Sequence, residues 1–248
     1  MIVNKSIKGL HIILHEAHGL LAGKIANEIA DQYRPINWFE TLIAICEHDD
    51  RQLNFKEKDY LSDIGVPLDF TVDSSSIQEV IKRMTRVLKS AANKSSWVKL
   101  LISYHVEYIY SHLKEESKKI SNYFKEEEQV RQEILKQFKI TDKKAREYYQ
   151  VLLFCDRLSL ILCKDETPDA QRMLEINTSI NGETYFIKKT ENEEYIISPW
   201  IFSETKFELS VEERILKETQ FTSSKQFETV LMKSEPHYKK WVIKKSKD

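Results

Sequence analysis

Hydrophobic residues recur every three or four positions through most of the chain up to about residue 164, the spacing that places them on one face of an α-helix. Serine, threonine and aspartate precede several of these stretches, as they commonly do at the first residue of a helix. The pattern predicts helices over residues 16–33, 39–49, 77–92, 97–113, 115–138 and 143–164. The helix over 115–138 carries so many charged residues that we expect it on the surface.

The pattern changes after Pro168, where hydrophobic and polar residues alternate as they do in β-strands. Asn181-Gly182 is a strong signal for a tight hairpin turn between two such strands. The predicted strands are 173–178, 183–188, 195–198, 206–211 and 240–244, and a short helix is predicted near 224–232. The predicted fold is therefore mainly α: a helical domain, residues 1–167, with a small β-rich α+β region, residues 168–248, packed on it.

Two short hydrophobic runs near the start of the chain, Met1–Val3 and Leu10–Leu14, fit either a strand or a lead-in to the first helix. In the helix that follows, Gly19, Gly23 and Ala26 form a stripe of small residues. Small residues at this spacing let another helix approach closely, because there is little side-chain bulk to hold it off. We therefore expect a neighbouring helix to lie against this stripe.

Composition narrows the class of protein. Five glycines and five prolines among 248 residues favour long uninterrupted elements, mainly helices. The 38 basic residues nearly balance the 39 acidic ones, so the chain has no net field to attract nucleic acid or a membrane surface. No stretch resembles a signal peptide, and no hydrophobic run approaches the roughly 20 residues of a membrane span.

The three cysteines, Cys46, Cys155 and Cys163, fall on hydrophobic helical faces and lack the spacing of a metal site. They are typical of reduced core residues, so we expect a cytoplasmic protein. The sequence contains no glycine-rich phosphate loop, Gly-X-Ser-X-Gly elbow or Cys-X-X-Cys pair. The sequence does not determine the oligomeric state, and a homo-oligomer is one of the alternatives.

The most informative stretch is the end of helix 39–49, where a hydrophobic face runs directly into His48 and Asp49. Both residues continue from that face, so their side chains begin by pointing into the protein. A buried imidazole beside a buried carboxylate needs a partner that offsets the loss of hydration. The helix therefore ends either in a buried hydrogen-bond cluster or in a metal site.

Two other predicted helices carry a polar residue within a hydrophobic face: His18 in helix 16–33 and Asp156 in helix 143–164. Two imidazoles and two carboxylates suit a divalent transition-metal ion. A lone buried carboxylate costs several kcal/mol, and a doubly charged ion would offset two of them. The alternative is that Asp156 pairs with Arg157 or a lysine, and that His18 is a hydrogen-bonded core histidine. The four residues together favour the metal site.

The order His18, His48-Asp49 and then Asp156, which is followed by Arg157-Leu158-Ser159-Leu160, resembles the HD-domain/phosphodiesterase-like superfamily of metal-dependent phosphohydrolases. The resemblance covers the predicted helical domain and implies an HD-like helical bundle. It also implies that the four histidine and aspartate residues are the protein ligands of a divalent ion. Iron, manganese, zinc and nickel are all candidate ions, since each accepts such ligands.

More closely, His-Gly-Leu-Leu-Ala-Gly at 18–23 and His-Asp-Asp at 48–50 resemble a branch of uncharacterised bacterial proteins with such a helical fold, a domain of unknown function. The tail with Pro199-Trp200-Ile201-Phe202 is similar to that branch as well. If the superfamily pattern holds, the protein is a metal-dependent phosphohydrolase that acts on a small phosphorylated molecule or a nucleotide. A metal-activated water would then attack the phosphate ester.

The sequence departs from better-known members of the superfamily after the His-Asp pair. Their motif often continues His-Asp-X-X-Lys, whereas here it reads His48-Asp49-Asp50-Arg51-Gln52. Arg51 is the nearest candidate for a phosphate clamp, and residues 51–76 are a candidate lid. His105 is the best candidate for a second metal ligand or a proton carrier, although a core histidine bonded to a neighbour fits it equally well. Asp50, Arg51 and His105 are thus the candidate catalytic residues.

A second class of function stays open: a non-catalytic protein of the same HD fold that binds a ligand or a partner. The missing lysine after His48-Asp49 favours this class, whereas the complete four-residue shell favours the enzyme. In both classes we expect a small phosphorylated substrate or ligand, and neither nucleic acid nor a membrane. His15, one turn before His18, is expected to be an ordinary core histidine.

Overall fold

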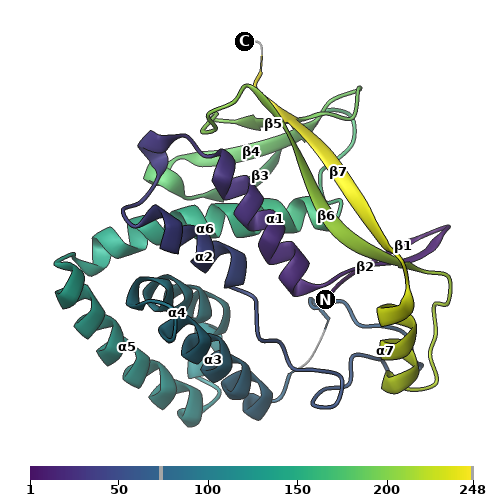
Figure 1. The fold of residues 1–248 in the computed structure, drawn as a ribbon, viewed down its shortest axis with the longest axis horizontal. Helices are drawn as coiled ribbons and strands as arrows, with labels where there is room; N and C mark the ends of the chain where they lie inside the picture. Colours follow the sequence, from purple (N-terminus) through teal and green to yellow (C-terminus); the bar gives the residue numbers. More distant parts are fainter. Residues whose placement is uncertain (73–74, 247–248) are drawn as a thin grey trace.

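The computed structural model describes residues 1–72 and 75–246 (Figure 1). Its helices are α1 (His15–Glu28), α2 (Trp38–Glu47), α3 (Ile77–Ala92), α4 (Ser96–Tyr110), α5 (Lys118–Phe138), α6 (Asp142–Cys163) and α7 (Ser224–Lys233), with short 3₁₀ turns η1 (Asp31–Tyr33), η2 (Ser111–Lys114) and η3 (Ile180–Gly182). Its strands are β1 (Ile2–Ser6), β2 (Gly9–Ile13), β3 (Leu174–Thr178), β4 (Thr184–Lys189), β5 (Tyr195–Ser198), β6 (Lys206–Leu216) and β7 (Pro236–Lys244).

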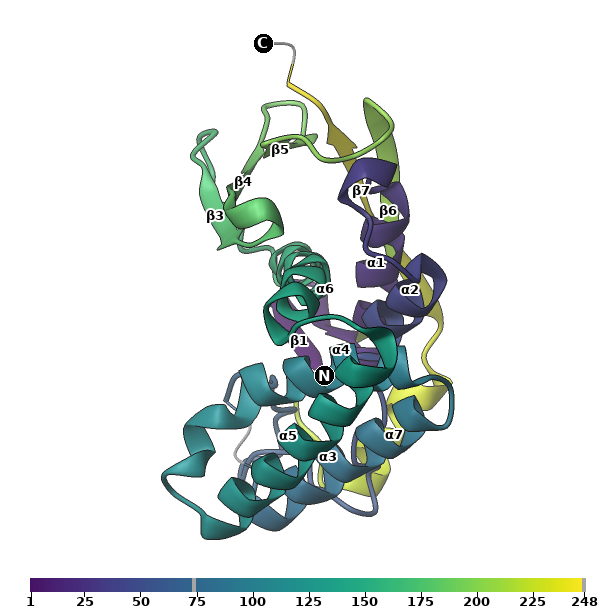
Figure 2. The same cartoon turned by 90° about the vertical axis from the view of Figure 1, so that its left-hand side faces the viewer.

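The strands form one mixed sheet in the order β1-β2-β6-β7-β5-β4-β3. β5 and β7 run parallel to each other, and the other neighbours are antiparallel. Figure 2 shows the sheet curving over α1 and α6, with α3, α4 and α5 on the side of these two helices that faces away from the sheet. The chain therefore begins in the sheet, builds the helices and returns to the sheet.

The predicted mainly helical HD-like bundle is wrong. In the described ranges, seven α-helices accompany a seven-stranded sheet, and two of its strands lie at the start of the chain. These strands, β1 and β2, are the two short hydrophobic runs that the sequence left open. Leu10 pairs with Leu216 of β6, and Leu10 and Ile12 are buried in a cluster with Leu216 and Phe227. A five-residue run shows its strand character only beside such a distant partner, so local spacing did not assign it.

Strands β6 and β7 extend beyond their predicted bounds of 206–211 and 240–244. In β6 the hydrophobic alternation gives way to Glu212, Glu213 and Arg214, which reads as the end of a strand. Glu213 is nevertheless buried, and its carboxylate lies 3.1 Å from Nδ1 of His11 on the neighbouring β2. The partner on the neighbouring strand thus stabilises a buried charge, whereas the local sequence pattern reads that charge as the end of the strand.

One hydrophobic core runs from the sheet through α1 and α6 to α4 and α5. α6 lies at its centre, with buried residues along its length. The division near residue 167 stays a prediction; strands from both sides of it share the sheet, and both sides contribute to this core. Across the described part of the chain, no helix has the length and hydrophobicity needed to cross a membrane.

The small residues of α1 let α2 lie directly against it. A Cβ atom added at Gly19 would lie 2.3 Å from the carbonyl oxygen of Cys46, and one at Gly23 would lie 2.2 Å from the Cys46 Sγ. Both distances are far inside van der Waals contact, so the approach requires glycine at these positions. The approach places the end of α2, where His48 lies, against His18 of α1. Packing of these two helices therefore positions three of the four predicted ligands.

Candidate metal centre

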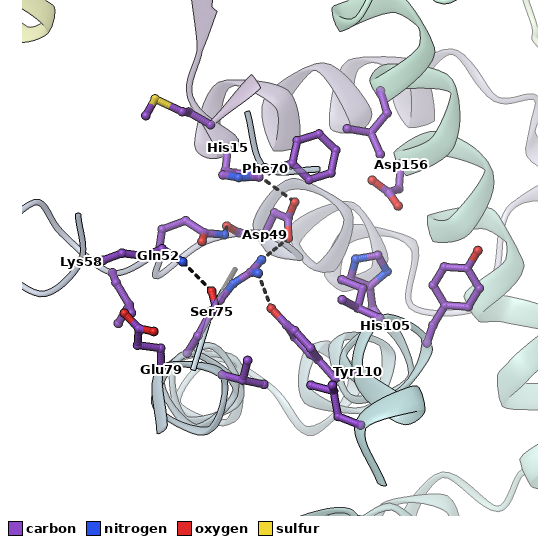
Figure 3. Close-up of a pocket in the computed structure, with 18 of the residues that line it drawn as sticks. His15, Asp49, Gln52, Lys58, Phe70, Ser75, Glu79, His105, Tyr110 and Asp156 are labelled. Atoms are coloured by element: carbon purple, nitrogen blue, oxygen red, sulfur yellow. Dashed lines mark hydrogen bonds and ion pairs between the residues drawn. The ribbon is translucent and has the colours of Figure 1, made fainter. Parts of the chain in front are cut away.

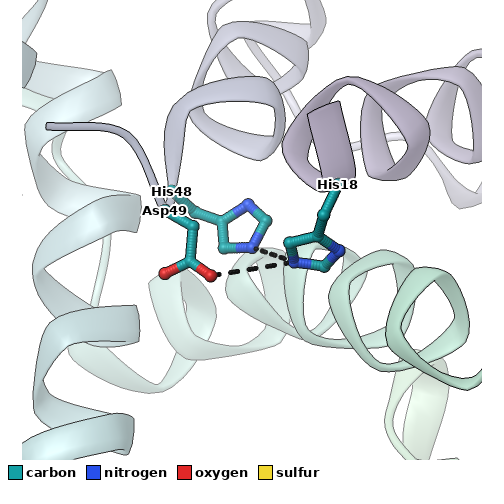
Figure 4. A group of neighbouring side chains, drawn as sticks. All are labelled: His18, His48 and Asp49. Carbon is teal, nitrogen blue, oxygen red and sulfur yellow. Dashed lines mark hydrogen bonds and ion pairs between the residues drawn. The ribbon is translucent and has the colours of Figure 1, made fainter. Parts of the chain in front are cut away.

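The four predicted ligands come together from three helices. His18 lies on α1, His48 and Asp49 lie at the end of α2, and Asp156 lies on α6. The Nε2 atoms of His18 and His48 are 3.2 Å apart, and each is 3.1 Å from Oδ1 of Asp156. Oδ2 of Asp49 is 3.8 Å from Nε2 of His18 (Figure 4). All four side chains are buried, so a group of potential metal ligands lies inside the protein.

Hydrogen bonds hold the outer nitrogen of each imidazole. Nδ1 of His48 lies 2.6 Å from the carbonyl oxygen of Ile45, one turn earlier in α2. Nδ1 of His18 lies 2.8 Å from Oγ of Ser159, which in turn donates to the carbonyl oxygen of Asp156 at 2.8 Å. The His48 ring is therefore oriented by a backbone carbonyl and the His18 ring by the Ser159 hydroxyl, and their Nε2 atoms are turned toward the centre of the cluster.

The cluster is electrostatically coupled. Burial is the largest single influence on the pKa of His48 and opposes protonation, but the charge of Asp156, its hydrogen bond to His48, the charge of Asp49 and the Ile45 carbonyl together raise that pKa to about 9. Burial would raise the pKa of Asp156, but the His48 charge and the hydrogen bonds from His18 and His48 hold that pKa well below its usual range. In the absence of another cation, His48 therefore carries a proton near pH 7 that it shares with Asp156.

Two residues outside the predicted ligand set hold Asp49: Arg83, which the sequence missed, and His15, which was expected to be a core histidine. Nη2 of Arg83, on α3, donates to Oδ1 of Asp49 at 2.5 Å, and Nδ1 of His15 lies 3.2 Å from its Oδ2. Burial acts to raise the pKa of Asp49, but the Arg83 charge, the His15 hydrogen bond and the charges of the neighbouring histidines together keep that pKa well below its usual range. Burial lowers the pKa of His15 to about 4. An arginine beside the hydrophobic stripe of an amphipathic helix is ordinary, so Arg83 carried no signal in the sequence.

His105 lies beside the cluster, on α4. Its ring centroid is 4.7 Å from that of His48, and its Nδ1 is 3.2 Å from the hydroxyl of Tyr149. His48, His105 and Asp156 each offer one ligand atom within 4.8 Å of the others. Burial, followed by the His48 charge, lowers the pKa of His105 to about 4. A base this weak is poorly matched to proton transfer near pH 7. The Tyr149 contact also fits a core histidine bonded to a neighbour, so the role of His105 as a ligand stays a prediction.

Asp50 and Arg51, the other candidate catalytic residues, lie away from the pocket that opens onto the cluster. α2 ends at Glu47, and Arg51 adopts a left-handed backbone conformation with φ of 64°. Nε of Arg51 donates to Oγ of Ser90 at 3.1 Å, and the side chain lines a separate hollow together with Asp50. The turn after α2 therefore directs the expected clamp to a different surface.

A pocket of about 420 Å³ opens onto the cluster. Figure 3 shows His15, Asp49, His105 and Asp156 around it, with Gln52 beside Asp49 and Lys58 farther from His105 and Asp156. Further lining residues include Arg83 and the hydrophobic or aromatic residues Phe70, Tyr108, Ile109, Leu113 and Leu160. A small molecule entering this pocket would meet polar groups at the cluster and hydrophobic groups along part of the wall.

The candidate lid, residues 51–76, forms one wall of the pocket in its described part. Glu57 accepts from Nη1 of Arg86 at 2.7 Å, and Oδ2 of Asp69 accepts from the backbone N–H of Val3 at 2.9 Å. These contacts tie the wall to α3 and to β1. Opening of this wall as a lid stays a prediction, and it would require these contacts to break.

Fold and site together define a mixed α/β protein with a buried cluster of two histidines and two aspartates facing a pocket. The family model described as "Protein of unknown function (DUF3891)" matches residues 1–218, so the chain belongs to this family. The matched range contains the whole cluster and the elements from β1 to β6. Comparison with curated proteins and with solved structures gave no match.

Proposed function

We propose that the cluster binds a divalent transition-metal ion. The supporting observation is the meeting of His18 Nε2, His48 Nε2 and Asp156 Oδ1 at 3.1–3.2 Å. The Ile45 carbonyl can only accept, so Nδ1 of His48 must hold the hydrogen of their 2.6 Å contact. A neutral His48 then turns a lone pair toward the other two atoms. Basic atoms this close together need a cation among them, either a proton or a metal ion.

The donor set fits such an ion. Imidazole nitrogens and carboxylate oxygens suit iron, manganese, zinc or nickel, and four protein ligands leave positions open on an ion that takes five or six. Arg83 holds the outer Oδ1 of Asp49, while Oδ2 lies on the side of His18. An outer partner of this kind orients a ligating carboxylate. When bound, the ion supplies a Lewis acid that lowers the pKa of water and polarises a phosphoryl oxygen.

The reaction class we infer is hydrolysis of a small phosphorylated molecule, nucleotides included. Arg83 supports this inference and takes the clamp role expected of Arg51, because its guanidinium lines the pocket 2.5 Å from Asp49. A planar guanidinium can donate two parallel hydrogen bonds to phosphate oxygens. The hydrophobic wall near Tyr108 and Leu160 would then contact the rest of the substrate.

A second candidate function is a non-catalytic ligand-binding protein. One observation favours it: Arg83 and His15 already engage both oxygens of Asp49, and Asp156 shares a proton with His48. A cluster that is paired in this way can persist as a purely structural network. The two candidates differ in whether the cluster carries an ion and whether turnover depends on it.

The test combines metal analysis with an activity comparison. Purified protein would be analysed for iron, manganese, zinc and nickel. Wild type and Asp49→Ala would then be compared on phosphate monoesters and diesters with each ion added. We expect about one ion per chain and turnover that Asp49→Ala abolishes. Asp31→Ala is a matched control, because it removes an exposed carboxylate outside the cluster, and it should retain both properties.

The outcomes separate the candidates. Stoichiometric metal with equal background rates in wild type and Asp49→Ala would favour a metal-containing binding protein. Absence of stoichiometric metal from wild type, even after addition of each ion, would favour the proton-paired structural network instead.

A further inference from the structure

Ser159 lies directly behind His18, one turn after Asp156 in α6. Its side chain is completely buried. Its Oγ is 2.8 Å from the backbone carbonyl oxygen of Asp156 and 2.8 Å from Nδ1 of His18. The hydroxyl therefore joins two proposed ligands without facing the proposed ion, which makes its hydrogen-bond direction informative.

Counting hydrogens fixes that direction. A serine hydroxyl has one hydrogen, and a carbonyl oxygen has none. The oxygens of Ser159 and Asp156, 2.8 Å apart, would repel unless the Ser159 hydrogen lies between them. With its hydrogen used there, Ser159 can only accept from His18. Nδ1 of His18 must then carry a hydrogen, and in the neutral ring Nε2 carries none.

We propose that Ser159 is a positioning residue that sets the tautomer of His18 and so makes Nε2 available to a metal ion; this inference rests on the proposed metal centre. A neutral imidazole binds a metal through the nitrogen that lacks hydrogen, and the partner of the other nitrogen selects which one that is. Nε2 of His18 is the atom that faces His48 and Asp156.

Loss of the Ser159 acceptor would favour the opposite tautomer. His18 could then keep its hydrogen on Nε2 and donate it to Oδ1 of Asp156, 3.1 Å away. The ring would lose its lone pair on the side of the cluster, although its position need not change. For His48 the corresponding partner is the Ile45 carbonyl, which a side-chain substitution does not remove. Ser159 is therefore the tautomer partner that can be tested by mutation.

Two substitutions remove the acceptor in different ways. Ser159→Ala deletes the hydroxyl, and Ser159→Cys keeps a group of similar shape whose sulfur is a weak acceptor. Ser103→Ala is a matched control, because Ser103 is also a buried helical serine whose Oγ donates to a carbonyl three residues earlier, that of Leu100, at 2.7 Å. The control therefore repeats the loss of a buried hydroxyl without a histidine partner.

Two measurements read the effect. Long-range ¹H–¹⁵N correlation spectra of the ion-free protein, recorded where the rings are uncharged, report which nitrogen of His18 carries hydrogen. Calorimetric titration with Zn²⁺ reports the metal affinity. We expect wild type to carry hydrogen on Nδ1, and both Ser159 variants to shift it toward Nε2. Their zinc affinity should fall by about 10- to 100-fold, the usual cost of losing an outer-shell partner, while Ser103→Ala changes neither quantity.

Three results would overturn the inference: hydrogen on Nε2 of His18 in wild type, an unchanged tautomer in both Ser159 variants, or unchanged zinc affinity in both. The wild-type spectrum alone decides the first, so the inference stays testable even if a variant fails to fold. If wild type binds no Zn²⁺, the proposed metal centre fails, while the spectra still report whether Ser159 sets the tautomer.

Discussion

The Asp49 side and the Asp156 side of the cluster balance their negative charges in different ways. Asp49 contacts the guanidinium of Arg83 at 2.5 Å, so a fixed positive charge meets it at any ordinary pH. The carboxylate of Asp156 pairs with the imidazoles of His18 and His48, each at 3.1 Å, and no lysine or arginine of residues 1–72 and 75–246 forms an ion pair with it. Its charge is balanced when His48, whose pKa is raised, holds a proton or when a metal ion is bound.

Because of this difference, we expect Asp49 to matter mainly for stability and Asp156 mainly for metal binding. Transfer of an unpaired carboxylate out of water costs several kcal/mol, so each needs its partner. The Asp49 partner is built into the chain, and the Asp156 partner is exchangeable. Stability of the ion-free protein should therefore depend most on Arg83, and metal affinity should depend most on Asp156.

The largest effect is expected for Arg83→Ala in ion-free protein. Asp49 would stay buried without its guanidinium, and breaking a buried ion pair from one side costs about 3 kcal/mol of unfolding free energy. Added Zn²⁺ should restore part of that loss, because the ion supplies the missing charge. Denaturant unfolding with and without Zn²⁺ measures both effects.

Arg86→Ala is the matched control for that experiment. Arg86 lies on the same helix and pairs with Glu57, but its side chain is more exposed than that of Arg83. Exposed ion pairs contribute little, so the control should lose much less stability and should not respond to Zn²⁺. Equal losses of unfolding free energy in the two variants would mean that the Arg83–Asp49 pair contributes no more to stability than an exposed ion pair.

The next effect separates the two carboxylates by their metal affinity. We expect Asp156→Asn to weaken Zn²⁺ or Mn²⁺ binding by about 100-fold and Asp49→Asn by about 10-fold, since Arg83 has already offset much of the Asp49 charge. Titration calorimetry measures the affinities. A chelator should also lower the melting temperature of wild type more than that of Asp156→Asn, because the variant holds less ion. The reverse order of affinities would contradict the comparison.

Between about pH 6.5 and pH 9, a change of stability with pH is expected on the Asp156 side. The pKa of His48 is about 9 in the ion-free fold, because Asp156, Asp49 and the Ile45 carbonyl together overcome the effect of burial, and it is about 6.5 in an unfolded chain. A base with a raised pKa in the fold stabilises it fully below the unfolded value and stops doing so above the folded value. Stability of ion-free wild type should therefore decline between about pH 6.5 and pH 9.

The control for the pH experiment is Asp156→Asn, which removes the charge that raises the pKa of His48. Without Asp156, the Asp49 charge and the Ile45 carbonyl remain to raise the pKa of His48 against burial, its largest single influence. The neighbouring His105 ring adds no negative charge, so the variant should lose most of the slope. Denaturant unfolding at several pH values measures the slope. A profile that is equally steep in both proteins would place the proton elsewhere.

The sequence predicted the buried cluster because its members are polar residues within otherwise hydrophobic helical faces, a signal that the neighbouring residues alone reveal. Helical spacing alone puts His18, His48 and Asp156 on hydrophobic faces, and an isolated polar residue there demands a partner. The partners themselves are set by tertiary contacts. Arg83 and Ser159 are ordinary residues for their helices, and only the packing of α3 and α1 against the cluster gives them a role.

The same limit explains the error in fold class. Periodicity is a strong signal over the 22 residues of α6 and a weak one over the five residues of β1 or β2. The strands at the start of the chain are stabilised by β6, far away in the sequence. Because the long elements of this region are helices, the sequence predicts a helical bundle. It does not reveal the full extent of the sheet that covers them.

The smallest effect is expected for Arg51→Ala, and it tests which cation faces the pocket. Nε of Arg51 donates to Ser90 on the surface, whereas Arg83 lines the pocket beside Asp49. Removal of an exposed side chain outside a network usually changes stability by no more than about 0.5 kcal/mol. Arg51→Ala should also leave the affinity of zinc-loaded protein for inorganic phosphate unchanged, while Arg83→Lys, which keeps the charge but loses the planar fork, should weaken it. If Arg51→Ala weakens phosphate binding more than Arg83→Lys does, the clamp lies after the His-Asp pair, and the permanent ion pair of Asp49 is structural alone.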